Sequence, residues 1–311
     1  MSQFRIRGLV AAPFTPFAPD GALDTAPIGA LVAHLKRKGI SGIFINGSTG
    51  ECASLSESER LAAAEAYVSA AREHGLVSVV HVGHDCLPTS CAFAAQAVEL
   101  GADAIATIPT SYFKLASVHT LVGYLQSIAA AAPGLPLFYY HIPRLTGSDF
   151  DMLELLRAAG RELPDLAGIK YSSPELSTFA TCKAFDGGRY NMLFGVDEML
   201  LAGLAMGADG AVGSTYNFMA PLYQRIIADF EAGDRQSAFE HQCKAAELVR
   251  IITGSAGAPG LKVAMALAGH DCGPPRLPLN TPAQGIVDEM RNRLEAAGFF
   301  EWCEPSADAP L

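Results

Sequence analysis

Residues 101–106 read Gly-Ala-Asp-Ala-Ile-Ala, and residues 207–212 read Gly-Ala-Asp-Gly-Ala-Val. In both segments a glycine follows an amphipathic stretch, and a short apolar run follows the aspartate. Glycine is favoured where a helix ends in a left-handed turn, and a continuous apolar run is typical of a strand buried on both faces. The repeated segment therefore indicates a helix that leads into a buried parallel strand.

The same alternation continues through the first 231 residues. Apolar runs predict eight strands, at residues 9–14, 42–46, 77–81, 104–108, 137–140, 166–170, 191–194 and 210–213. Helical patterns lie between them, at residues 28–38, 57–74, 89–100, 118–131, 151–159, 175–184, 198–206 and 221–231. No GxGxxG motif follows a predicted strand, which disfavours a dinucleotide-binding sheet. The spacing favours an α/β fold, a (β/α)8 TIM barrel.

The strand signals stop after residue 231. Three further helical patterns follow, at residues 236–253, 261–268 and 283–297, and a Pro-rich connector covers residues 272–278. We therefore expect two units. Residues 1–231 form the barrel that carries the active site, and residues 232–311 form a C-terminal helical extension packed on it.

Composition excludes several classes of function. The formal net charge is −10, which does not suit binding to nucleic acid or to an anionic membrane surface. No apolar stretch is long enough to span a bilayer, and the N-terminal apolar run is too short for a signal peptide. Seven cysteines without a CxxC motif indicate reduced thiols and a cytoplasmic protein.

Active sites of (β/α)8 barrels lie at the carboxyl ends of the strands. Lys170 closes the sixth apolar run there, in the sequence Leu-Ala-Gly-Ile-Lys. It either extends to solvent or pairs with a carboxylate, or its amine forms a Schiff base with a carbonyl substrate. An apolar pocket favours Schiff-base formation. Burial disfavours the charged form of the amine, and the uncharged form is nucleophilic.

The second run ends in Gly47-Ser48-Thr49-Gly50-Glu51. Glycines permit a turn whose N–H groups converge on an anion, and two hydroxyls add donors, so a carboxylate would fit. The segment is otherwise only a tight loop. It lacks the Lys-Ser/Thr ending of a P-loop.

Further candidate side chains lie at or just after the ends of predicted strands. Tyr140 is a candidate proton relay, although buried strand tyrosines usually belong to the core. Asp197 and Glu198 precede a helix, where they either complement its dipole or accept hydrogen bonds from substrate hydroxyls. His81, His84 and Asp85 do not have the spacing of a helical metal motif, and we expect no metal site.

These motifs together resemble the pyruvate-dependent class I aldolases of the dihydrodipicolinate synthase and N-acetylneuraminate lyase superfamily, over about residues 5–300. The segments 139–143, 195–198 and 213–217 are similar to the sialic acid lyase branch. In dihydrodipicolinate synthases an arginine that binds the second substrate's carboxylate stands two residues after the strand-five proline. Here that position is Leu145, and Arg144 is one residue earlier, so Arg144, like His84 and Asp85, has no assigned role.

The resemblance implies specific roles. Lys170 would form the Schiff base, Tyr140 would relay protons, and Ser48 and Thr49 would hold the keto acid's carboxylate. The sugar portion would be contacted by Ser172, Gly195, Asp197, Glu198 and Ser214. Tyr112 would match a second tyrosine near the site.

The implied reaction is cleavage of N-acetylneuraminate to N-acetylmannosamine and pyruvate, with no metal or organic cofactor. The implied partners are a keto sugar acid and pyruvate, and the implied assembly is a homotetramer. Another pyruvate aldolase remains an alternative, either a dihydrodipicolinate synthase or a 2-keto-3-deoxy sugar acid aldolase. A non-catalytic keto-acid sensor and a barrel with unrelated chemistry are alternatives of a different class.

Overall fold

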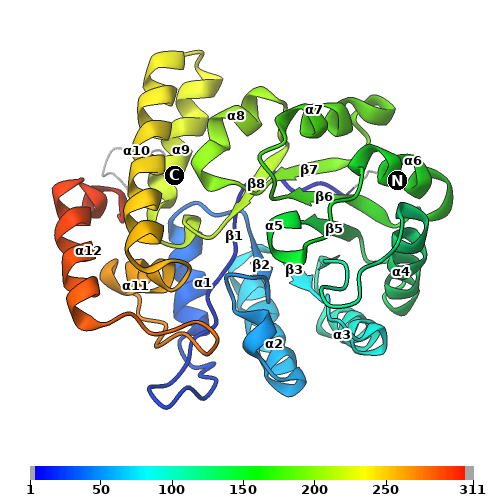
Figure 1. The fold of residues 1–311 in the computed structure, drawn as a ribbon, viewed down its shortest axis with the longest axis horizontal. Coiled ribbons are helices and arrows are strands. Elements are labelled where there is room, and N and C mark those ends of the chain that lie inside the picture. The colour runs from blue at the N-terminus through cyan, green and yellow to red at the C-terminus, as the bar shows by residue number, and fades with distance from the viewer. Residues whose placement is uncertain (1–3, 305–311) are drawn as a thin grey trace.

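Eight parallel strands close into a barrel, in chain order, within residues 4–304, the part of the chain that the computed structural model describes (Figure 1). The strands are β1 (Gly8–Ala11), β2 (Gly42–Ile45), β3 (Val77–His81), β4 (Ala104–Thr107), β5 (Leu137–His141), β6 (Leu166–Tyr171), β7 (Asn191–Phe194) and β8 (Gly210–Gly213). Pairing of β1 with β8 completes the closure. The predicted (β/α)8 barrel is confirmed.

Helices follow the strands and cover the outside of the barrel, except for the short α5, which lies at the carboxyl end of the strands (Figure 1). They are α1 (Ile28–Arg37), α2 (Glu57–His74), α3 (Leu87–Leu100), α4 (Val118–Ala131), α5 (Pro143–Thr146), α6 (Met152–Glu162), α7 (Leu176–Ala184), α8 (Leu200–Ala205) and α9 (Tyr216–Glu231). A capping box at Ser56 and Glu59 begins α2. Glycines in the left-handed conformation end α2 and α3, at Gly75 and Gly101.

Most element boundaries differ from the sequence prediction by one to three residues, and the differences at β1, α5 and α9 have clear physical reasons. β1 ends at Ala11 rather than residue 14, because Pro13 has no N–H with which to continue the ladder. α9 begins five residues before Pro221, and the chain accommodates the proline with a break at Met219 (φ −130°, ψ 38°). The short helix α5 was not predicted, because one turn carries no periodic pattern.

The apolar side chains form two cores, one on each side of the strands. Alternate strand residues such as Phe44, Phe138, Leu193 and Val212 form one cluster inside the barrel. Their neighbours, such as Ile43 and Ile45 of β2, belong to the larger cluster beneath the helices. Tyr140 belongs to the inner cluster. Lys170, its register partner on β6, therefore also points into the barrel.

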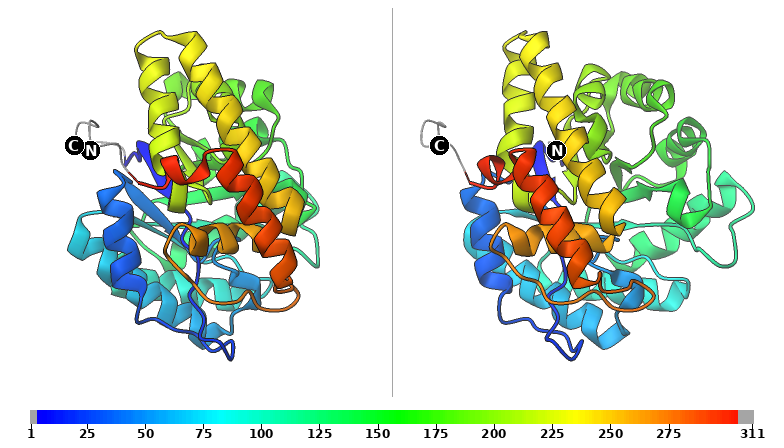
Figure 2. Two further views of the ribbon diagram at one scale, coloured as in Figure 1. Left: turned by 90° about the vertical axis from the view of Figure 1, so that its left-hand side faces the viewer. Right: turned by 60° about the vertical axis from the view of Figure 1, so that its left-hand side comes forward.

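The C-terminal extension packs against α9 and reaches the carboxyl end of the barrel. It contains α10 (Arg235–Ala256), α11 (Pro259–Leu267) and α12 (Gln284–Ala296). Figure 2 shows α12 lying against α10, and α10 against α9. The expected division after residue 231 falls between α9 and α10, and residues 305–311 of the expected extension lie outside the described residues.

Two further findings concern the described part of the chain. None of its helices combines the length and the apolar character that a membrane crossing requires. All seven cysteines fall within it, and each is a free thiol.

Candidate active site

A cavity of about 460 Å³ opens at the carboxyl end of the barrel. Loops after β1, β2, β5, β6, β7 and β8 contribute to its wall, as do α10 and α11. The structure brings nine of the predicted site residues to it: Ser48, Thr49, Tyr140, Lys170, Ser172, Gly195, Asp197, Glu198 and Ser214. The volume lies in the range of small-molecule sites.

Lys170 is the nucleophile candidate of this cavity. Its residue is 4% exposed, and its amine nitrogen lies 3.8 Å from the centroids of the Phe44 and Tyr140 rings. Burial lowers the pKa of Lys170 to about 7, against the opposing charge of Asp197. A substantial fraction of the amine is therefore unprotonated at neutral pH and can attack a carbonyl.

Tyr140 lies beside that amine on the neighbouring strand. Burial raises the pKa of Tyr140 to about 12, and hydrogen bonding from Ser48 and Ser172 opposes the shift. The phenol is thus protonated at neutral pH, with hydroxyls on both sides of it. Such a group can pass a proton to or from a ligand bound at Lys170.

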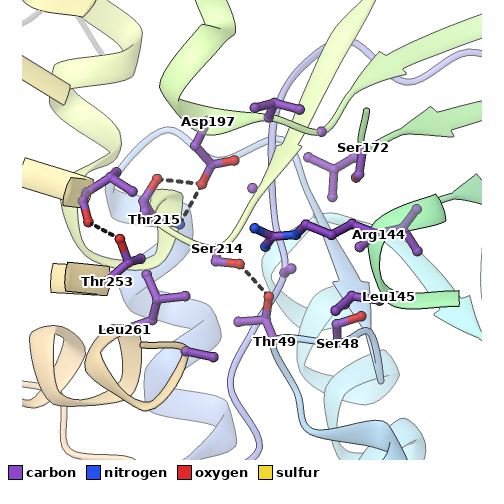
Figure 3. Close-up of a pocket in the computed structure, with 18 of the residues that line it drawn as sticks. Ser48, Thr49, Arg144, Leu145, Ser172, Asp197, Ser214, Thr215, Thr253 and Leu261 are labelled. Carbon is purple, nitrogen blue, oxygen red and sulfur yellow. Dashed lines mark hydrogen bonds between the residues drawn. The ribbon is translucent and has the colours of Figure 1, made fainter. Parts of the chain in front are cut away.

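The turn after β2 places two hydroxyls on the cavity wall. The Thr49 and Ser214 hydroxyls share a hydrogen bond of 2.5 Å, which joins the ends of β2 and β8 (Figure 3). The Glu51 N–H donates to the Ser48 carbonyl at 3.0 Å and closes the turn. Glu51 itself has a left-handed backbone (φ 55°), which is unusual for a residue with a side chain.

Asp197 lies on the opposite side of the cavity, in a short turn after β7. Its carboxylate accepts hydrogen bonds from the Thr215 N–H (3.0 Å) and the Thr215 hydroxyl (2.6 Å) (Figure 3). Burial raises the pKa of Asp197 to about 6. The carboxylate is therefore mostly charged at neutral pH. Its hydrogen bonds go to the residue that follows β8, so its role is not confined to complementing the dipole of the following helix.

Two glycines permit close approaches within the site. A Cβ at Gly195 would lie 2.2 Å from the Ser172 hydroxyl, and a Cβ at Gly213 would lie 2.3 Å from an Asp197 carboxylate oxygen. Any side chain at Gly195 would displace Ser172. The glycine thus supports the site by its lack of a side chain.

Within the single chain, Tyr112 does not line the cavity. Its side chain is 80% exposed, and its ring packs edge to face on Phe113 at 5.0 Å. Asp85 holds this loop by accepting hydrogen bonds from the Ser111 and Tyr112 N–H groups. The structure thereby gives Asp85 a local role that the sequence did not indicate.

His84 also has local partners. Its Nδ1 accepts a hydrogen bond from the Cys86 N–H at 2.9 Å, and its carbonyl accepts one from the Tyr124 hydroxyl at 3.2 Å. Within residues 4–304, no group of three or more His, Cys, Asp or Glu side chains is arranged to hold a metal ion.

Arg144 projects from α5 into the cavity (Figure 3). Within the described residues its guanidinium has no hydrogen-bond or ion-pair partner. Leu145 lines the same wall and is 58% exposed. An unpaired guanidinium on a cavity wall is available to hydrogen-bond a bound ligand.

The sequence did not point to the residues that the C-terminal extension contributes. They are Val249, Thr253, Ala258, Pro259, Leu261, Lys262, Pro275 and Leu279. The one available signal was Lys262, a charged residue within the apolar stretch Pro-Gly-Leu-Lys-Val-Ala-Met-Ala-Leu of α11. Its amine lies 2.9 Å from a carboxylate oxygen of Glu51, and both side chains are 4% exposed.

Comparisons with known proteins show relatives over nearly the whole chain. Residues 5–297 match the model of the dihydrodipicolinate synthetase family. An N-acetylneuraminate lyase of Xenopus tropicalis is 41% identical over 294 residues, which cover 93% of this chain and 96% of that protein. An N-acetylneuraminate lyase of Homo sapiens is 38% identical over 306 residues, which cover 96% of this chain and 95% of that protein.

A solved structure shows the same fold. The N-acetylneuraminate lyase of Proteus mirabilis superposes with a TM-score of 0.91 at 38% identity, and the match covers 95% of this chain and all of that chain.

Proposed function

The chain belongs to the dihydrodipicolinate synthetase family, and from this we propose that it is a class I aldolase that cleaves N-acetylneuraminate to N-acetylmannosamine and pyruvate. The observation that carries the chemistry is the buried Lys170 amine beside the Tyr140 ring at the floor of the cavity. The full-length similarity to N-acetylneuraminate lyases supports the choice of substrate.

The open-chain keto acid binds with its carboxylate on the turn that carries Ser48 and Thr49. The Lys170 amine attacks C2, and loss of water leaves an iminium. The iminium accepts the electron pair of the C3–C4 bond as that bond breaks and a proton leaves the C4 hydroxyl. The products are N-acetylmannosamine and an enamine, which gains a proton at C3 and is hydrolysed to pyruvate and free lysine.

Tyr140 relays the protons in these steps, because its protonated phenol lies beside the Lys170 amine. The wall that faces the sugar portion is formed by Ser172, Gly195, Asp197, Glu198 and Ser214. The lysine itself is the electron sink, so the mechanism uses no organic cofactor.

The decisive experiment measures pyruvate release from N-acetylneuraminate by the wild type and by Lys170→Ala. Release by the wild type alone supports both the substrate and the lysine mechanism. If the folded wild type releases none, the N-acetylneuraminate assignment is wrong. Assays with 2-keto-3-deoxy sugar acids and with aldol condensations would then distinguish the other pyruvate aldolases.

We also propose that the chain assembles as a homotetramer. The exposed Tyr112 and Phe113 rings, 80% and 81% exposed, form an apolar surface that another copy would cover. Light scattering coupled to gel filtration tests the assembly, and a monomeric mass contradicts it.

The seven free thiols support a cytoplasmic location, which fractionation of the source cells would test. We further propose that residues 1–231 carry the catalytic groups and that residues 232–311 form an extension packed on them. The wall residues of α10 and α11 mean that the extension completes the cavity.

A further inference from the structure

The turn that carries Ser48 and Thr49 ends in a buried carboxylate. Glu51 closes the turn through its N–H, and its left-handed backbone is maintained without the conformational freedom of a glycine. A residue other than glycine keeps a left-handed backbone only where its surroundings impose that conformation. The contacts of the Glu51 side chain therefore determine how the turn is held.

Those contacts come from the C-terminal extension. The Lys262 amine donates to one Glu51 carboxylate oxygen at 2.9 Å, and the Arg276 N–H donates to the other at 2.8 Å. Lys262 also donates to the Pro274 carbonyl at 3.1 Å. Both carboxylate oxygens thus have partners from residues more than 200 positions away in the sequence.

A second set of contacts surrounds the pair. The Lys262 amine and the Arg276 guanidinium each lie 4.2 Å from the centroid of the Phe17 ring. The Arg276 guanidinium also pairs with Glu59 of α2 at 2.6 Å. Loops after β1 and β2 and the extension are therefore joined around one buried ion pair.

We infer that Lys262 is a positioning residue for the carboxylate-binding turn, acting through Glu51 to hold Ser48 and Thr49 in the geometry that receives the keto acid's carboxylate. The inference rests on the proposed function. Its physical basis is that a buried carboxylate without a counter-charge is strongly unfavourable. Loss of Lys262 would also remove the hydrogen bond that ties one Glu51 oxygen to α11, and without this tie the turn would be released.

Pyruvate trapping measures this directly, because it requires the turn and Lys170 but no sugar portion. The full-length protein is incubated with increasing pyruvate and cyanoborohydride, and the adduct is measured by intact mass. For Lys262→Met we expect the half-saturating pyruvate concentration to rise at least fivefold. The limiting trapping rate should stay within threefold of the wild type, because the Lys170 and Tyr140 pair is untouched.

The double variant Glu51→Gln/Lys262→Met separates positioning from stability. It removes the buried charge, so its melting temperature should recover toward that of the wild type. The amide oxygen of the introduced glutamine can still accept the Arg276 N–H, so only the tie to Lys262 is lost. The half-saturating pyruvate concentration should nevertheless remain raised. If Lys262→Met does not fold, the double variant replaces it in the trapping experiment.

Lys244→Met is the matched control, since Lys244 forms a half-exposed ion pair with Glu247 at 2.7 Å on α10 of the same extension. It should bind pyruvate as the wild type does. The inference is overturned if folded Lys262→Met has unchanged half-saturation, or if the double variant recovers binding together with stability. If the wild type itself forms no adduct, the proposed function fails first, and the inference fails with it.

Discussion

The Lys170 amine nitrogen lies 3.8 Å from the centroid of the Tyr140 ring, and the two residues are register partners on β6 and β5. Because side chains alternate along a strand, this register directs both groups into the barrel. The nucleophile and its candidate proton relay are thus fixed by neighbouring strands rather than by a flexible loop. Their separation depends on the pairing of β5 with β6.

Trapping with pyruvate and cyanoborohydride should label Lys170, and the rate should depend on pH. Only the free amine attacks the carbonyl, and the pKa of Lys170 is lowered to about 7. The initial trapping rate should therefore fall about tenfold between pH 8 and pH 6, as the amine becomes protonated. Peptide mapping by mass spectrometry identifies the labelled residue.

Lys262 provides an internal control for this experiment. It also lines the cavity, but its amine is held by Glu51 at 2.9 Å and should remain unlabelled. An adduct on Lys262 in place of Lys170 would contradict the assignment of the nucleophile. A trapping rate that is flat from pH 6 to pH 8 would contradict the lowered pKa.

Tyr140→Phe should slow turnover at least 100-fold, which is the usual contribution of a positioned acid–base group. The phenylalanine ring preserves the contact with the Lys170 amine, so half-saturation of trapping by pyruvate should change less than threefold. Steady-state cleavage of N-acetylneuraminate and pyruvate trapping together measure the two effects. Turnover at the wild-type rate would rule out the relay.

The fold was largely predictable, because the signals that define a barrel are local. The apolar runs located all eight strands within three residues at each end, and the bounds of α2 and α4 were predicted without error. Glycine and capping signals act within a single turn, so they can be read from neighbouring residues. The late start predicted for α9 shows the limit of this approach, since Pro221 is typical of a helix beginning although this helix continues across it.

The site was predictable only where it lies at strand ends. Ser48, Tyr140, Lys170 and Asp197 follow or close predicted strands, and barrel topology alone places such residues together. The contribution of α11 depends on contacts more than 200 residues apart in the sequence, and a charged residue within an apolar stretch does not indicate its partner. For that reason Lys262 was missed.

Asp197→Ala should reduce kcat/KM for cleavage of N-acetylneuraminate roughly tenfold to 100-fold, the range expected when a charged hydrogen-bond acceptor is lost. Pyruvate trapping should be preserved, and removal of the nearby negative charge should lower the pKa of Lys170 further. Asp197→Asn is the control, because its amide oxygen can still accept the Thr215 N–H. Equal loss of cleavage and trapping in both variants would indicate that Asp197 only supports the fold.

Arg144→Ala should raise KM for the sugar acid severalfold while leaving pyruvate trapping unchanged. The guanidinium enters the cavity without a partner among the described residues, so its hydrogen bonds are available to the distal part of the substrate (Figure 3). Its position on a surface turn means that the substitution should hardly affect the melting temperature. Arg144→Lys should bring KM only part of the way back to the wild-type value, because lysine lacks the planar fork of donors. Leu145→Ala tests whether the turn itself matters, and an equal rise in KM for that variant would show that Arg144 makes no specific contact.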